Sequence, residues 1–263
     1  MQIAQIIQGP PKILIYSEVG VGKTAEALTL GERAEVLDFD NGLRTAVSLK
    51  DQFTEQRLKV NARQFIETDP MSRASAFKTA KEYIYSLPSE IKNGRYPYQA
   101  LIIDSLSSFA EAGVAQIMYN SGQLGKNPEI QHWGLAFTEI KNVMATLRSL
   151  PIVLVVLAHE QVKTIGKGAD AENKLEIAIS GKNLPSQICR YFDEIWYMRA
   201  KAEGAGKFKR VFQTVSDGIK VARSRSCLPN DTDASVGMWE IIKKLGYEPP
   251  KVEAKSGEGK NQS

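Results

Sequence analysis

Cysteine, long hydrophobic runs and excess charge are all scarce in this sequence of 263 residues. The two cysteines, Cys189 and Cys227, lie far apart, which excludes a disulfide framework and a cysteine zinc site. The longest strongly apolar run, residues 152–158, is far shorter than the roughly 20 residues that span a membrane. The first residues lack the basic stretch and cleavage site of a secretory signal. We therefore expect a cytoplasmic protein without a membrane partner.

The composition and the small net charge set further limits. A net charge of +4 is too small to indicate a nucleic-acid partner by itself. The charged share of 24% and the aromatic share of 8% are typical of a folded, soluble protein and exclude wholesale disorder. A chain of this length is expected to form one large α/β domain or two small ones.

Strands alternate with helices through the first 158 residues. Short apolar runs predict strands at 12–16, 35–39, 100–104 and 152–158. Helical spacing predicts helices at 72–87, 109–119 and 129–150, with Pro88 and Pro151 as stops. Strands that are almost entirely Val, Ile and Leu, with helices between them, indicate a parallel sheet that is covered on both faces.

The pattern changes after residue 158. Residues 160–180 are polar and have no sustained periodicity, so we expect a long functional loop. Strands at 193–199, 208–215 and 218–222 would form an antiparallel edge, and 238–245 a short closing helix. The expected organisation is an α/β core at 1–225, a closing segment at 226–247 and a disordered tail at 248–263.

The sequence Gly20-Val21-Gly22-Lys23-Thr24 lies between a predicted strand and a predicted helix, as a P-loop requires. Backbone N–H groups and the helix N-terminus would bind phosphates, Lys23 would contact the β- and γ-phosphates, and Thr24 would bind Mg²⁺. The strict motif has glycine where Ser17 stands. An ordinary glycine turn with an exposed lysine is the alternative. The expected nucleotide-binding residues are Ser17, Val19, Gly20, Val21, Gly22, Lys23, Thr24 and Ala25.

Two aspartates at strand ends complete the expected ATP site. Asp104 ends the strand at 100–104 and would hold Mg²⁺ together with Thr24, unless it only caps the next helix. The next residue is Ser105, so the glutamate that many P-loop ATPases place there is absent. Asp40 is the candidate for orienting the attacking water, because it follows a strand that we expect beside the P-loop strand. Asp38 shares its face but lies farther from the phosphate edge, and a turn-forming role for Asp40 is the alternative.

The strand at 152–158 is followed by His159, Glu160 and Gln161 at the same edge. Either His159 or Gln161 could detect the γ-phosphate and pass its presence to the loop that follows. The alternative is a polar strand end without such a role. The other histidine, His132, lies in a predicted helix and is expected to pack there.

These residues, in this order, resemble the core of RecA-superfamily ATPases over roughly residues 11–225, and most of all the single-domain phage recombinases of the Sak-four type. The resemblance implies an α/β, RecA-like P-loop core with a mostly parallel sheet, flanking helices and antiparallel strands at one edge. It implies ATP and Mg²⁺ as cofactors and catalytic roles for Lys23, Asp40, Asp104, His159 or Gln161, Arg223 and Arg225. Asp40 replaces a glutamate of the family, which bears on the rate of hydrolysis and not on nucleotide binding.

The resemblance also implies partners. Residues 107–128 and 160–181 match the two DNA-binding loops of the family. Lysines in and directly after the second of these segments are therefore candidates for contacting single-stranded DNA. Arg223 and Arg225 match a basic finger that reaches the ATP of a neighbouring subunit, so the protein would act as a ring or filament. A single-strand-binding protein is a candidate partner, and a phage-encoded protein would work in the cytoplasm of its bacterial host. The candidate DNA-binding residues are Lys163, Lys167, Lys174 and Lys182.

Charge along the chain refines this picture. Residues 199–225 hold eight basic and two acidic residues, a net charge of +6, which is a plausible footprint for the phosphates of ATP or DNA. A solvated basic edge is the alternative. The polar segment after Gln161 has a net charge of only +1, so charge alone does not make it a DNA site.

Three functions remain open at this stage. The leading one is an ATP-dependent recombinase that binds single-stranded DNA and anneals or pairs strands as an oligomer. The second is a ring helicase or another motor ATPase with the same core. The third is a nucleotide-gated accessory or loader protein with little affinity for DNA.

Overall fold

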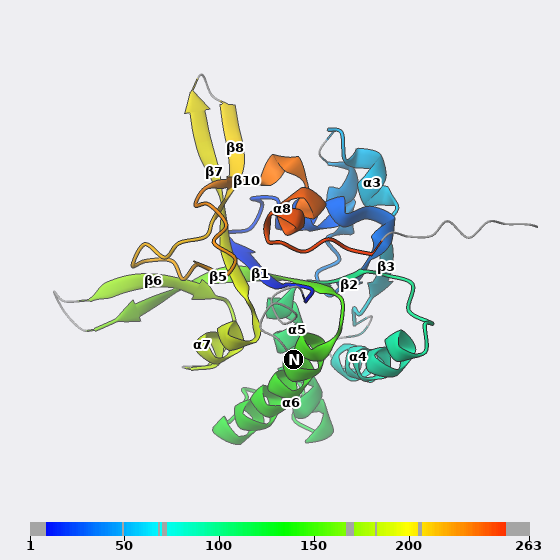
Figure 1. The fold of residues 1–263 in the computed structure, drawn as a ribbon. Helices are drawn as coiled ribbons and strands as arrows, with labels where there is room; N and C mark the ends of the chain where they lie inside the picture. The colour runs from blue at the N-terminus through cyan, green and yellow to red at the C-terminus, as the bar shows by residue number, and fades with distance from the viewer. Residues whose placement is uncertain are drawn as a thin grey trace, which may run out of the picture.

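The computed structural model describes residues 9–48, 50–67, 69, 73–166, 171–181, 183–204 and 207–250. Its centre is a sheet in which neighbouring strands are mostly parallel (Figure 1). In order across the sheet, the parallel strands are β7 (Glu194–Gly204), β1 (Lys12–Ser17), β5 (Val153–Ile165), β4 (Ala100–Asp104), β2 (Ala34–Asp38) and β3 (Asn61–Gln64). The predicted α/β class with a mostly parallel sheet is confirmed.

Antiparallel strands extend this sheet mainly beyond β7. Strands β8 (Lys207–Gln213) and β9 (Arg223–Ser224) pair with β7, and β10 (Thr232–Asp233) pairs with β8. The predicted antiparallel edge therefore exists, but β7 itself is parallel to β1, because its first residues pair with residues 13–16 of β1. Strand β6 (Glu172–Ile177) pairs with the second half of β5.

Helices cover both faces of the sheet. Helices α4 (Ala76–Lys92), α5 (Leu106–Asn120), α6 (Ile130–Ser149) and α7 (Leu184–Ile188) lie on one face (Figure 1). Helices α2 (Lys23–Ala27) and α8 (Met238–Lys244) lie on the other, together with a 3-10 helix at Leu28–Arg33 and the short α3 (Thr54–Leu58). None of the helices in these described ranges is long and apolar enough to cross a membrane.

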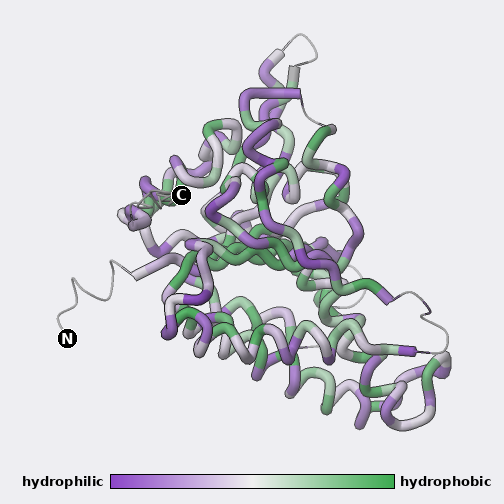
Figure 2. The backbone as a smooth tube through the Cα atoms, turned by 90° about the vertical axis from the view of Figure 1, so that its right-hand side faces the viewer, coloured by the Kyte–Doolittle hydropathy of each residue, from purple (hydrophilic) through white to green (hydrophobic). Residues whose placement is uncertain are grey.

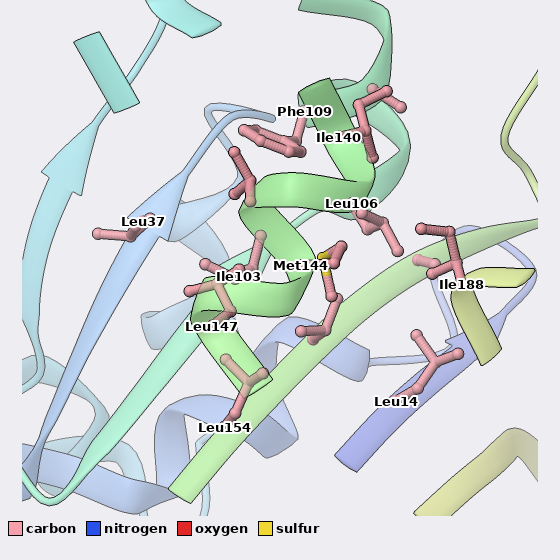
Figure 3. Close-up of a cluster of buried hydrophobic side chains, with 14 of the residues drawn as sticks. Leu14, Leu37, Ile103, Leu106, Phe109, Ile140, Met144, Leu147, Leu154 and Ile188 are labelled. Carbon is pink, nitrogen blue, oxygen red and sulfur yellow. The ribbon is translucent and has the colours of Figure 1, made fainter. Parts of the chain in front are cut away.

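The two hydrophobic clusters follow from the alternation of side chains along each strand. In β1, Leu14 faces the cluster under α5 and α6, whereas Ile13 and Ile15 face the cluster under α8. Figure 2 shows that hydrophobic residues concentrate in the central layer. In Figure 3, Leu106 and Phe109 of α5 and Met144 of α6 gather over the strands. Burial on both faces explains why these strands lack polar alternation.

The closing helix α8 packs directly against the segment that follows the P-loop helix. The backbone N–H of Met238 donates to Thr29 Oγ1 at 2.8 Å, and Nε1 of Trp239 donates to the carbonyl of Leu30 at 2.9 Å. Ile241 and Ile242 are fully buried in the same cluster. The predicted helix at 238–245 is thus confirmed, and most of the predicted tail, from residue 251 on, lies outside the described residues.

The predicted long loop at 160–180 is wrong for most of its length. Strand β5 continues to Ile165, and β6 returns beside it, so the described part of this segment is a two-stranded hairpin. The hairpin projects from the body (Figure 1). Because it has little core to cover, its strands are mostly polar and partly exposed, and they lack the alternation that identifies a strand in a sequence.

Two further predictions are corrected. Helix α4 does not stop at Pro88 but continues to Lys92. Ile91, beyond the proline, packs against the core, and this burial favours the turn that a proline disfavours. Residues 218–222 form no regular strand; a single bridge joins Lys220 to Leu175. The short elements α3, α7, β3 and β10 have no clear sequence pattern and were not predicted.

Candidate functional site

The loop after β1 folds around the side chain of Lys23. Gly20 (φ +84°) and Gly22 (φ +109°) adopt the left-handed conformation that favours glycine. Lys23 Nζ donates to the carbonyls of Ser17 and Glu18 and to Ser17 Oγ, each at 3.0 Å. Burial lowers the pKa of Lys23, although Asp104, Glu160 and Asp40 oppose this shift. Ser17 therefore supplies two of the oxygens that hold Lys23 at the position where the strict motif has glycine.

Thr24 and Asp104 lie in direct contact at the start of α2 and the end of β4. Thr24 Oγ1 donates to Asp104 Oδ2 at 2.8 Å. Burial raises the pKa of Asp104 to about 6, and the nearby carboxylates of Asp40 and Asp38 also raise it. A hydroxyl and a carboxylate at one point are the oxygen donors that Mg²⁺ uses together with phosphates. These two residues would hold that ion, as their types predicted.

Asp40 and His159 form the second pair of the site. His159 Nε2 lies 3.1 Å from Asp40 Oδ2, and Ser105 Oγ donates to Asp40 Oδ1 at 3.2 Å. Burial would raise the pKa of Asp40, but hydrogen bonds from His159, Ser108 and Ser105 outweigh it and hold the pKa below its usual range. Asp40 is then ionised at neutral pH and only accepts, so Nε2 of His159 carries the proton of this bond.

The expectation that the strand before Asp40 lies beside the P-loop strand is wrong. Strands β5 and β4 stand between β1 and β2 in the sheet. Asp40 still reaches the site because it lies two residues beyond the end of β2, at the edge where His159 leaves the parallel part of β5. Asp38 stabilises the turn that follows β2. Its carboxylate accepts hydrogen bonds from the backbone N–H groups of Asp40 (3.1 Å) and Gly42 (3.4 Å) and from the side-chain amide of Gln64 (3.0 Å).

A cleft of about 370 Å³ joins these pairs to the P-loop. Besides Lys23, Thr24, Asp40, Asp104 and His159, it is lined by Val19, Gly20, Val21, Gly22, Ala25, Gly42, Thr45, Ser48 and Arg210. All predicted nucleotide-binding residues except the buried Ser17 therefore line one cleft. Gln161 lies outside it: its side chain donates to Glu176 Oε1 (3.2 Å) and the carbonyl of Ile179 (3.4 Å) at the base of the hairpin.

Arg223 and Arg225 do not reach the cleft of their own chain. The guanidinium of Arg223 donates to the carbonyls of Cys189 (3.1 Å) and Phe192 (2.6 Å). Arg225 Nη1 lies 3.0 Å from Asp193 Oδ1, and its side chain is half exposed. Since Ser224 pairs with Glu194, the first residue of β7, Arg225 lies toward the edge of the sheet opposite the P-loop.

The four lysines predicted to contact DNA are only partly described. Lys163 and Lys174 stand directly opposite each other in the hairpin, and Lys163 Nζ lies 3.0 Å from Glu176 Oε2. Lys167 and Lys182 lie outside the described residues. Directly opposed lysines repel each other. Glu176 therefore offsets part of the positive charge of this pair.

The basic segment 199–225 is largely neutralised within the fold. Arg199 and Lys201 contact Asp231 at 2.7 and 2.8 Å, and Lys209 contacts Asp233 at 2.7 Å. These acids lie beyond residue 225, so the charge count of the segment alone could not include them. The segment as a whole is therefore not a phosphate-binding surface as predicted. Only individual residues of it remain candidates for contacting phosphates.

The residues of this cleft lie in a part of the chain that matches a known protein family. A protein-family model described as an AAA domain matches residues 9–226, which include every residue of the cleft. No curated protein is similar enough to match the chain. The flagellar accessory protein FlaH from Methanocaldococcus jannaschii is similar in structure, with a TM-score of 0.44, 11% sequence identity and coverage of 78% of each chain.

A second solved structure is similar to the same extent. It is an ATPase from the type III secretion system of pathogenic bacteria, with a TM-score of 0.44 and 14% sequence identity. The alignment covers 73% of this chain and 52% of that one.

Proposed function

Because the chain belongs to the AAA domain family of P-loop ATPases, we propose that it couples ATP binding to the capture of single-stranded DNA. In this proposal the protein anneals or pairs DNA strands as an oligomer, in the cytoplasm of its host cell. Lys163 and Lys174 of the hairpin would contact the DNA backbone together with Lys167 and Lys182. A single-strand-binding protein is the further partner we propose.

One observation carries the proposal: a single strand joins the ATP cleft to the exposed hairpin. Strand β5 lies between β1 and β4, passes His159 in the cleft and continues without interruption to Ile165. Val162 and Ile165 are exposed on β5, and Lys163 of β5 lies opposite Lys174 of β6. A change in the contact between His159 and Asp40 can therefore shift the position of the hairpin, because no hinge separates the two along β5.

The residues of the cleft have distinct tasks in ATP hydrolysis. Lys23 would exchange its bonds to the loop for bonds to phosphate oxygens, and Thr24 and Asp104 would hold Mg²⁺. When bound, this ion neutralises phosphate charge. Asp40, ionised and held by Ser105 and His159, can accept a hydrogen bond from the attacking water and orient it.

The position of the basic finger supports assembly with further copies. Arg223 and Arg225 lie away from their own P-loop, so a role at ATP requires a neighbouring subunit. Arg225 is the better candidate, because its side chain is half exposed and its contact with Asp193 is at the surface. In a ring or filament, ATP would then lie at the interface between subunits.

Binding of a labelled single strand, measured by gel shift with and without ATP, tests the proposal. We expect ATP to tighten binding, and we expect the affinity to fall with increasing salt as phosphate contacts are screened. Equal, negligible binding under both conditions would contradict the proposal and would favour an accessory protein.

The motor alternative is tested by a different readout. A ring helicase separates a forked duplex in one direction while it hydrolyses ATP. The proposed recombinase instead accelerates the pairing of complementary single strands. Directional unwinding without annealing would replace the proposal by the motor function.

A further inference from the structure

Arg210 is a basic residue of the cleft that no sequence motif identified. It lies on β8 and lines the same cleft as the P-loop. Its guanidinium packs on Gly22: a Cβ atom added to Gly22 would lie only 2.9 Å from Arg210 Nη1. A glycine at position 22 thus makes room for the arginine as well as for the turn.

The sheet order explains how a strand so distant in sequence reaches the P-loop. Tyr16, next to the end of β1, pairs with Tyr197 of β7, and Ala200, three residues farther along β7, pairs with Arg210. Arg210 therefore lies beyond the carboxyl end of β1, level with the loop that follows it. This placement depends on pairing between β1, β7 and β8.

The ion pair of Arg210 is longer than that of Arg199 on the neighbouring strand β7. Its Nη2 lies 3.9 Å from Glu26 Oε2, whereas Arg199 contacts Asp231 at 2.7 Å. Its Nη1 is buried and has no hydrogen-bond partner among the described atoms. Buried N–H groups of a guanidinium need acceptors, and the planar guanidinium matches the oxygens of a phosphate.

We propose that Arg210 binds the phosphates of the nucleotide held by its own P-loop. The inference rests on the proposed ATP site and adds a cationic ligand that the same chain supplies, in contrast to a finger from a neighbour. Arg210 contacts Gly22 at the start of α2, where loop N–H groups surround the α- and β-phosphates. It should therefore contribute to the binding of both ATP and ADP.

The test is the affinity of the full chain for fluorescent ATP and ADP analogues. In Arg210→Gln we expect both dissociation constants to rise by about 10- to 100-fold, the usual effect of losing a charge-assisted hydrogen bond in a buried site. Arg210→Lys keeps the charge and should lose less. The matched control is Arg199→Gln on β7, whose side chain does not line the cleft and which should bind within about threefold of wild type.

A purely structural role is separated by two further measurements. If Arg210 only supports the loop, Arg210→Ala will melt at a lower temperature without nucleotide, and added ethylguanidinium will not restore nucleotide binding. The proposal predicts that this small guanidinium restores binding. Wild-type affinity in Arg210→Gln, or failure of the rescue in folded Arg210→Ala, would overturn it. Failure of the wild type to bind nucleotide would instead overturn the proposed function.

Discussion

Nε2 of His159 lies 3.1 Å from Oδ2 of Asp40, although β4 separates β5, which carries His159, from β2, which precedes Asp40. The contact joins the candidate for orienting water to the strand that becomes the exposed hairpin. It gives ATP a physical route to the proposed DNA-binding element, because both residues line the cleft and β5 is continuous. The following predictions test the parts of this arrangement separately.

Replacing Asp40 by asparagine should separate hydrolysis from nucleotide binding. The amide keeps the shape of the side chain but loses the negative charge that orients water. We expect kcat for ATP hydrolysis to fall by about 100-fold or more, with the ATP dissociation constant within about threefold of wild type. Steady-state hydrolysis and equilibrium binding measure the two effects. Wild-type kcat in this variant would remove Asp40 from the mechanism.

Asp38→Asn is the matched control for Asp40→Asn. Asp38 is fully buried, and its carboxylate accepts three hydrogen bonds that shape the turn. The main effect should be a lower free energy of unfolding, by about 1–3 kcal/mol, measured by urea denaturation. A similar loss of stability in Asp40→Asn would point to a shared structural role.

Replacing Asp104 by asparagine should stabilise the protein and abolish its response to Mg²⁺. The pKa of Asp104 is raised to about 6 in the fold, against 3.8 as the reference value. The native state therefore binds the proton more tightly, and stability falls as pH rises from about 4 to about 6. At pH 7.5 the neutral amide avoids this cost, so the free energy of unfolding of the variant should be about 1–3 kcal/mol higher than that of the wild type.

Thermal melting with ATP, at increasing Mg²⁺, provides the second half of that test. The wild type should be stabilised by Mg²⁺ with ATP, and Asp104→Asn should not be. Thr24→Ala should lose the same response without the gain in stability, because Asp104 stays charged and loses its hydrogen bond. Wild-type Mg²⁺ dependence in both variants would contradict the assigned ion site.

Lys174→Glu should stabilise the hairpin while it weakens DNA binding. Lys163 keeps its contact with Glu176, and a glutamate at position 174 would remove the repulsion between the two opposed lysines, worth about 0.2–1 kcal/mol. The affinity for single-stranded DNA should fall, and so should the slope of log affinity against log salt, because fewer phosphates are contacted.

Lys78→Glu provides the control for this charge reversal. Lys78 is exposed on α4 and makes only a 4.0 Å contact with Glu82. The same change of charge at this site should leave the DNA affinity nearly unchanged. Equal losses in both variants would indicate an effect of net charge and not of the hairpin.

Local patterns in the sequence predicted the parts of the site that depend on neighbouring residues. The P-loop and the contact of Thr24 with Asp104 follow from a glycine motif and from strands buried on both faces, both visible in short stretches. The α/β class followed from the same strands. These features require only that parallel strands end at one edge.

Features that depend on the order of strands could not be predicted. Arg210 reaches the P-loop only because β8 pairs with β7 and β7 with β1. The neutralisation of Arg199 and Lys201 depends on Asp231, which no charge count of the segment includes. The hairpin was missed because few of its side chains are buried, so no hydrophobic period marks its strands.

The most direct test of coupling between ATP and DNA is the affinity of Lys23→Ala for a labelled single strand, with and without ATP. Lys23 is the cleft residue that must leave the loop oxygens to bind phosphate. In the wild type, ATP should tighten DNA binding by about tenfold or more, whereas in Lys23→Ala the two affinities should be equal. Full ATP-dependent tightening in folded Lys23→Ala would contradict the coupling.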